Sequence, residues 1–126
     1  MGFKTDRMRV AGLGSAHEGS GHWWSQRLTS VALVPLTLLF VFPLSYNLGA
    51  GHARVLEAYS HPFNAIVAVL FIATVFRHLQ QGLQVVIEDY VHGKAVRTGL
   101  LVGNVLFCWL CGLTGVFALA KIAFSA

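Results

Sequence analysis

The chain has 126 residues, 56% of them hydrophobic and 11% charged, with a mean hydropathy of +0.65 and a formal net charge of +4. Soluble domains carry about 25% charged residues, so this composition excludes an ordinary soluble domain. The positive net charge does not indicate nucleic-acid binding, because the basic residues are not gathered on one exposed face.

Residues 1–27 are predicted to form a cytoplasmic N-terminal arm. They contain four Lys or Arg side chains, and the glycines at 12, 14, 19 and 21 are typical of an irregular segment. Because this part of the sequence has no apolar stretch, we expect no cleaved signal peptide. The arm ends in His22-Trp23-Trp24-Ser25-Gln26-Arg27, which is typical of an anchor at the membrane interface and alternatively of a contact with a soluble partner.

Residues 28–126 are predicted to form an all-α anchor domain with three transmembrane helices. Long runs without charged side chains place the spans at about 28–48, 62–88 and 98–120, and each is long enough to cross a bilayer. Pro35 and Pro43 predict that the first helix is bent. Residues 49–61 and 89–98 are predicted to be connections, and Gly93 suits the left-handed end of a helix.

Small residues in the third span predict close helix packing. Gly99 and Gly103 form a GxxxG pair, and the spacing of small residues is repeated by Cys108 and Gly112 and by Cys111 and Gly115. We interpret the two cysteines as small packing residues rather than as a redox or metal motif.

The basic residues predict the orientation of the spans. Six Lys or Arg side chains lie in the arm and in residues 89–98, whereas the other two ends of the spans have only Arg54 and Lys121. By the positive-inside rule, the N-terminus and residues 89–98 are cytoplasmic, and the C-terminus is periplasmic.

The second span carries a histidine well inside its apolar run. His78 and Asp89 are eleven residues apart, so they differ by about 20° around a helix and lie about 16 Å apart along its axis. Gly82 falls on the same face and removes a side chain there. Beside this face we predict a polar stripe, and on the opposite side a lipid-like apolar back. The stripe comprises Arg77, Gln81, Gln84 and Glu88, and the back comprises Val69, Ile72, Phe76, Leu83 and Ile87.

An ionisable side chain within a span is costly and points to a function. His78 could hydrogen-bond a neighbouring helix while Arg77 pairs with a partner's carboxylate. Alternatively, His78 could be an axial haem ligand through Nε2, with Arg77 and the glutamines near the haem carboxylates. Tyr90 could be an aromatic interface residue, or it could donate a hydrogen bond to a quinone carbonyl while Asp89 tunes it or relays protons.

The run from His78 to Gly93, HLQQGLQVVIEDYVHG, strongly resembles the second-helix signature of the small hydrophobic membrane anchors of succinate dehydrogenase (respiratory complex II). The stretch HWWSQRLTS is similar to the segment that precedes the first helix in that family, and the resemblance covers about residues 20–121. Glu88 departs from the family pattern, in which a small polar residue precedes the Asp-Tyr pair.

The resemblance implies that His78 is the axial ligand of the iron of a haem b shared with a second anchor subunit. It implies that Tyr90 bonds the ubiquinone ring and that Asp89 is the acid beside it. It further implies iron–sulfur and flavoprotein partners in a complex that oxidises succinate and reduces quinone. The uncleaved basic start favours a multi-pass protein of a bacterial inner membrane.

We expect no residue of this chain to catalyse the succinate reaction itself. Two alternatives stay open: a fumarate reductase anchor working with menaquinone, and a haem-free structural anchor or assembly factor.

Overall fold

The computed structural model describes residues 5–11 and 19–125, and within these ranges every regular element is a helix. A short helix, α1 (Asp6–Ala11), is followed by three long ones: α2 (Gly19–Asn47), α4 (Pro62–Tyr90) and α5 (Lys94–Phe124). A further helix, α3 (His52–Ser60), connects α2 to α4. Each long helix is long and apolar enough to cross a membrane, which confirms the predicted all-α fold with three spans.

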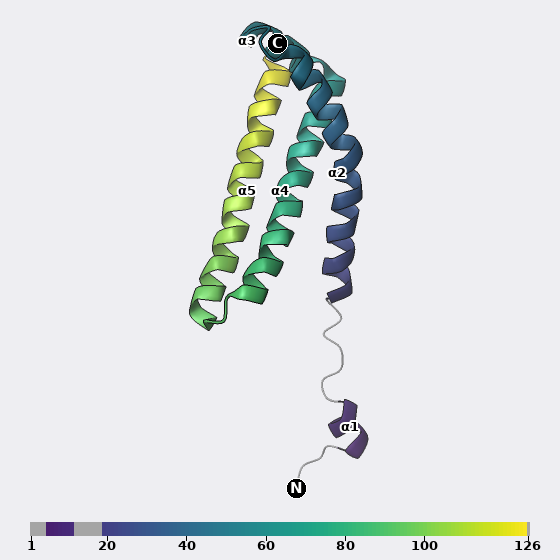
Figure 1. Ribbon diagram of the computed structural model, residues 1–126, viewed down its shortest axis with the longest axis vertical. Coiled ribbons are helices and arrows are strands. Elements are labelled where there is room, and N and C mark those ends of the chain that lie inside the picture. Colours follow the sequence, from purple (N-terminus) through teal and green to yellow (C-terminus); the bar gives the residue numbers. More distant parts are fainter. Residues whose placement is uncertain (1–4, 12–18, 126) are drawn as a thin grey trace.

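The three long helices lie side by side, with α4 packed against both α2 and α5 (Figure 1). The chain direction alternates between successive spans, so α3 and the C-terminus lie at one end of the bundle. The start of α2 and the connection between α4 and α5 lie at the other end (Figure 1). In a protein with three spans, the first connection and the C-terminus must lie on one side of the membrane, and the N-terminus and the second connection on the other. Which of the two sides faces the cytoplasm stays a prediction from the basic residues.

A reporter fused after residue 126 tests the orientation. We expect a reporter that is active only in the periplasm to be active at this position, because six basic residues against two favour a cytoplasmic N-terminus. A fusion in residues 91–93 should give the opposite result, since this connection lies at the other end of the bundle. Activity of a cytoplasmic reporter at residue 126 would contradict the orientation.

The helix α2 begins earlier than the predicted first span, so residues 22–27 belong to a helix rather than to an irregular arm. Trp23 and Trp24 are exposed there and meet edge to face, with 5.2 Å between their ring centroids. The Arg27 guanidinium carbon lies 5.3 Å from the centre of the Trp23 ring, a cation–π contact. This exposed cluster is compatible with both interpretations, the interface anchor and the contact with a soluble partner. Residues 12–18 of the predicted arm lie outside the described residues.

Residues 49–61 are more than a connection, because α3 packs on the bundle. Gly49 and Gly51 have φ angles of 85° and 91°, the left-handed region that glycine adopts without strain, and they turn the chain into α3. Tyr59 of α3 is buried and donates a hydrogen bond of 3.2 Å to the Phe40 carbonyl. Burial raises the pKa of the Tyr59 hydroxyl above its ordinary value. The Phe40 ring in turn stacks on Phe71 of α4, with centroids 4.5 Å apart.

The end of α4 differs from the prediction. Gly93 has φ −70° and ψ 115°, which is not left-handed, so the predicted glycine stop is wrong. The helix ends at Tyr90, and the Val91 N–H still bonds the Ile87 carbonyl at 3.0 Å. Gly93 instead precedes the first turn of α5, where its carbonyl accepts a bond of 2.8 Å from the Arg97 N–H.

The contact between α4 and α5 depends on two glycines. A Cβ at Gly112 would lie 3.2 Å from the Phe76 Cβ, and one at Gly115 would lie 3.0 Å from the Ile72 Cγ2. The predicted packing role of small residues is confirmed at these positions, whereas Gly99 and Gly103 face open space. The prediction that Ile72 and Phe76 form part of a lipid-facing back is therefore wrong, because α5 covers them.

A buried polar contact that sequence reasoning did not single out also joins α4 and α5. The Asn104 amide donates a hydrogen bond of 2.8 Å to the Gln80 backbone carbonyl. The Cys108 thiol lies 3.5 Å from the Asn104 Oδ1. Both cysteines are free and Cys108 is buried, in keeping with their interpretation as packing residues.

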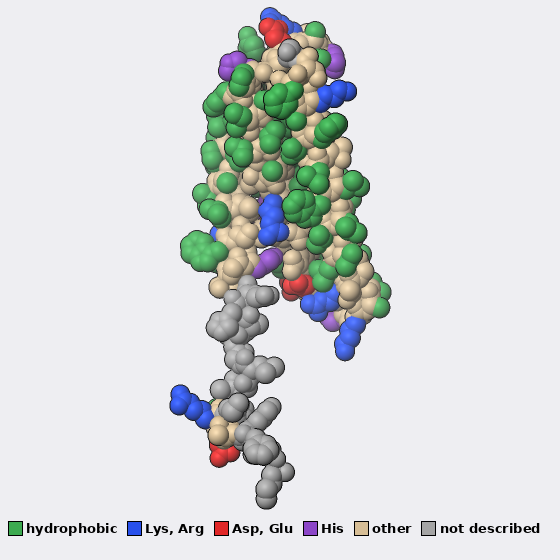
Figure 2. All heavy atoms as spheres, turned by 180° about the vertical axis from the view of Figure 1, so that it is seen from behind, with side chains coloured by type: hydrophobic (Ala, Val, Ile, Leu, Met, Phe, Trp, Pro, Cys, Tyr) green, Lys and Arg blue, Asp and Glu red, His purple; other side chains and the backbone are tan. Residues whose placement is uncertain are grey.

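Burial is unevenly distributed along the bundle. The buried residues Tyr59, Ala65, Val67 and Ala68 gather near the α3 end. The buried polar side chains lie further toward the opposite end, and they are Gln80, Gln81 and Asn104. Figure 2 shows hydrophobic side chains exposed along much of one face, with basic and histidine side chains interrupting them toward the α2 start. Lipid or partner chains must cover this apolar surface in the membrane.

Candidate functional site

His78 lies in the second half of α4 and is partly buried. Its Nδ1 is 2.9 Å from the Thr29 Oγ1, so the imidazole is tied to α2. Among the described residues, no hydrogen bond reaches the other ring nitrogen, Nε2. The structure thus contains the bond to a neighbouring helix and also leaves free the nitrogen that haem ligation requires.

One turn beyond His78, Gly82 faces α2. A Cβ at this position would lie 3.7 Å from the Gln26 Nε2, which is an ordinary van der Waals distance. The packing of α2 on α4 therefore does not itself require a glycine here. Its missing side chain leaves space on the face that carries His78, as the sequence predicts.

The polar stripe on α4 differs from the predicted one in a single member. Three hydrogen bonds form the chain: Arg77 Nη1 to Gln80 Oε1, Gln80 Nε2 to Gln84 Oε1 at 3.4 Å, and Gln84 Nε2 to Glu88 Oε1 at 3.0 Å. Gln80 thus takes the place that the sequence assigned to Gln81. Steps of three and four residues are equally compatible with one helix face, so spacing alone does not distinguish the two glutamines.

Gln81 is instead completely buried, and neither of its amide atoms has a hydrogen-bond partner within the described part of the chain. The same holds for two buried atoms of α2, His22 Nε2 and Gln26 Oε1. A buried polar atom without a partner costs about 1–3 kcal/mol. These unpaired atoms therefore mark a region that a further polar group would stabilise.

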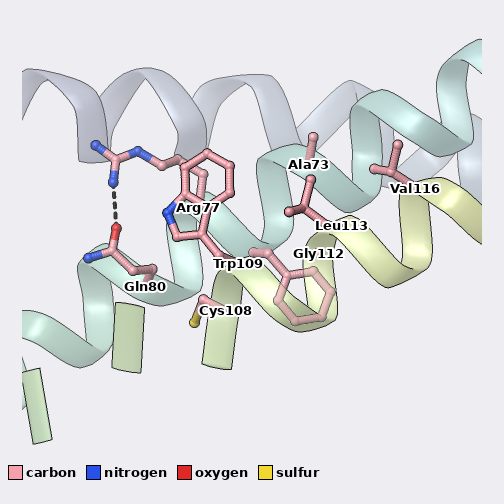
Figure 3. Close-up of a pocket in the computed structure, with 9 residues that line it drawn as sticks. Ala73, Arg77, Gln80, Cys108, Trp109, Gly112, Leu113 and Val116 are labelled. Atoms are coloured by element: carbon pink, nitrogen blue, oxygen red, sulfur yellow. Dashed lines mark hydrogen bonds between the residues drawn. The ribbon is translucent and has the colours of Figure 1, made fainter. Parts of the chain in front are cut away.

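An apolar groove of about 150 Å³ lies between α4 and α5, on another side of α4 from the contact with Thr29. Figure 3 shows Arg77 and Gln80 hydrogen-bonded at its edge, with Trp109 beside them. The residues that line it do not include His78, Asp89 or Tyr90. The groove is therefore not the site that the sequence predicts.

Asp89 and Tyr90 form the last turn of α4, and both are exposed. The Tyr90 side chain is 77% exposed, and its hydroxyl has no hydrogen bond to any described residue. The structure does not bring Tyr90 close to His78, because twelve helical residues separate them by about 18 Å along the axis. The two therefore belong to different positions along one helix, near its end and toward its middle.

The donor set fits one half of a haem site. A haem axial position takes a neutral imidazole with a free nitrogen, and the haem carboxylates take hydrogen-bond donors. His78 offers the first, and the exposed Arg77 guanidinium beside it in the sequence offers donors on the same helix. No group of three or more His, Cys, Asp or Glu side chains in the described ranges could hold a bare metal ion.

Comparison with known proteins identifies the family to which the chain belongs. Residues 1–120 match the family model described as succinate dehydrogenase/fumarate reductase transmembrane subunit. A succinate dehydrogenase hydrophobic membrane anchor subunit from Paracoccus denitrificans is 33% identical over 100% of this chain and 97% of its own length. The corresponding protein of Rickettsia conorii is 30% identical over 93% and 94%. A succinate dehydrogenase membrane anchor subunit of Reclinomonas americana is 35% identical over 63% and 68%. No solved structure gave a significant match.

Proposed function

The chain belongs to the family of succinate dehydrogenase and fumarate reductase transmembrane subunits, and from this premise we propose that it supplies one axial ligand of a haem b and part of a ubiquinone-reducing site. It is a succinate dehydrogenase membrane anchor subunit and a multi-pass protein of the bacterial inner membrane. As an anchor subunit it works within a complex. The partners in the proposal are a second cytochrome b anchor, an iron–sulfur subunit and a flavoprotein subunit.

One observation carries the haem proposal. His78 is held by its Nδ1 at 2.9 Å from Thr29, while Nε2 has no partner in the described residues. An axial ligand needs this arrangement, because one nitrogen must be fixed and the other must be free to bind iron. A bound haem would accept and release single electrons, and the second axial ligand would come from the partner anchor.

One further polar group of the chain would serve the haem. The Arg77 guanidinium is fixed by Gln80 and carries a positive charge inside the span, where it favours a nearby carboxylate. Because Arg77 is exposed, it would pair with a haem carboxylate that apolar surroundings alone would not stabilise.

The proposed quinone site lies at the end of α4. The Tyr90 hydroxyl is exposed and unpaired among the described residues, so it is free to donate a hydrogen bond to a quinone carbonyl. Asp89 precedes it and can pass protons as the ring is reduced. Glu88 accepts a hydrogen bond from Gln84 at 3.0 Å, so its carboxylate belongs to the polar stripe. Partner chains would supply the remaining quinone contacts.

Purification of the chain with its natural partners tests the proposal. We expect a flavoprotein, an iron–sulfur protein and a second small membrane protein to copurify, and the sample to show the optical spectrum of a b-type haem. Reduction of ubiquinone in preference to menaquinone would favour succinate oxidation over fumarate reduction. A complex without a haem spectrum would favour the haem-free anchor, in which the Thr29 contact alone accounts for His78.

A further inference from the structure

The contact between Thr29 and His78 determines more than the position of the ring. Thr29 Oγ1 lies 3.0 Å from the Ser25 carbonyl oxygen and 3.0 Å from the Gln26 carbonyl oxygen, both one turn earlier on α2. It also lies 2.9 Å from His78 Nδ1. A threonine hydroxyl has a single hydrogen to donate and two lone pairs with which to accept.

The two carbonyl oxygens can only accept hydrogen bonds, so donation of the single hydroxyl hydrogen to the backbone of α2 accounts for all three contacts, whereas donation to His78 Nδ1 leaves both carbonyl contacts without a hydrogen. With the hydrogen assigned to the backbone, Thr29 Oγ1 turns a lone pair toward His78. For a bond to form at 2.9 Å, Nδ1 then carries the imidazole proton and acts as the donor. In a neutral ring this leaves the lone pair on Nε2.

We propose that Thr29 is a positioning residue that fixes His78 in the tautomer with a free Nε2 lone pair and holds the ring in its orientation. This inference rests on the proposed haem function, because the tautomer matters only if Nε2 binds iron. It also makes the cross-helix bond and the ligand role compatible. The hydrogen bond to Thr29 could by itself explain why a histidine is tolerated within the span. In this proposal the same bond orients the imidazole for iron binding, a common arrangement at metal-binding histidines.

The position of Thr29 depends on the register of α2 and α4. The two helices are antiparallel, and His78 faces Thr29 while Gly82 faces Gln26. A step of four residues along α4 thus corresponds to three in the reverse direction along α2. Because these contacts are one turn apart, a shift of either helix would remove the acceptor from Nδ1.

Threonine-to-valine substitution in the assembled complex tests the inference. Thr29→Val keeps the shape of the side chain and removes the acceptor, and we expect about a 10- to 100-fold loss of haem affinity. The haem midpoint potential should also rise, because an imidazole without an acceptor at Nδ1 donates less electron density to oxidised iron. Thr29→Ser keeps the hydroxyl and should retain the affinity and potential of the unaltered complex.

Ser30 offers a matched control on the same helix. Its hydroxyl donates a hydrogen bond of 2.8 Å to the Gln26 carbonyl, and the structure shows no cross-helix partner for it in the described residues. Ser30→Ala therefore removes a hydroxyl from the same turn without touching His78, and the haem potential should stay unchanged. A shift equal to that of Thr29→Val would show a general effect on α2 and overturn the inference.

The outcomes separate this inference from the proposed function. If Thr29→Val keeps the haem affinity and potential while His78→Ala loses haem, Thr29 is not a positioning residue but the haem function stands. If His78→Ala also keeps an unaltered spectrum, the haem function itself fails. If Thr29→Val does not assemble, Thr29→Ala and Thr29→Ser are compared. A higher potential in the alanine variant supports the role of the hydroxyl, and equal potentials overturn it.

Discussion

Replacement of His78 by alanine is expected to abolish the normal spectrum of the haem in the assembled complex. The iron would lose the axial ligand that this chain supplies, and an alanine methyl group has no lone pair to replace it. We expect loss of most of the haem, or a change from a six-coordinate to a five-coordinate spectrum. Optical spectra and a redox titration of the purified complex measure both effects.

His92 provides the control for this substitution. It lies just beyond the same helix, is exposed, and has no hydrogen bond to the described residues. His92→Ala should therefore leave the haem spectrum unchanged. An unaltered spectrum and potential in His78→Ala would show that His78 is not a ligand. Quinone reduction need not fall with loss of the haem if, in the proposed complex, the iron–sulfur subunit delivers electrons to the quinone directly.

Replacement of Tyr90 by phenylalanine is expected to lower the rate of ubiquinone reduction about tenfold to a hundredfold. A hydrogen bond to a group that becomes charged is worth about 1.5–3 kcal/mol, and each 1.4 kcal/mol corresponds to about tenfold in rate. The exposed Tyr90 hydroxyl has no partner among the described residues, so its removal breaks no bond within the described chain. Succinate oxidation with a soluble dye, which takes electrons before the quinone, should stay nearly intact.

Tyr46 allows the same change at a matched position. It is 88% exposed near the end of α2 that lies away from the α4–α5 connection. Tyr46→Phe should change neither assay, because an interface tyrosine is replaced there by another aromatic ring. Normal quinone kinetics in Tyr90→Phe would reduce Tyr90 to an interface residue and assign the quinone chemistry to partner chains.

The sequence predicted the three spans because uninterrupted apolar runs are a local property. It also predicted the packing role of Gly112, but it gave the same weight to Gly99, which faces open space. Only the rotation of α5 about its own axis distinguishes the two, and that rotation depends on Phe76 in another helix. The helix α3 was missed because its glycine neighbours and charged residues are typical of a connection.

The candidate site likewise combines features that the sequence predicts with contacts that only the packing of the helices determines. The position of His78 within its span was visible in the sequence, because an ionisable residue interrupts an apolar run. Thr29 bonds its own backbone, which is a local contact, but its contact with His78 depends on the register between α2 and α4. The exchange of Gln80 and Gln81 also depended on tertiary packing, since either residue satisfies helical spacing.

The uneven burial along the bundle means that its two ends differ in the stability that the chain alone can supply. Near α3, the chain buries its own side chains, with Tyr59 and Ala68 among them, so this end can close without help. Around Gln81 the buried atoms are polar and unpaired, and in lipid no water can satisfy them. The bundle is therefore held together mainly by apolar packing near α3, and it is less stable around Gln81, where buried polar atoms lack hydrogen bonds within the described residues. Any group that pairs these atoms would therefore stabilise this end of the bundle, while the packed residues near α3 keep the spans in register.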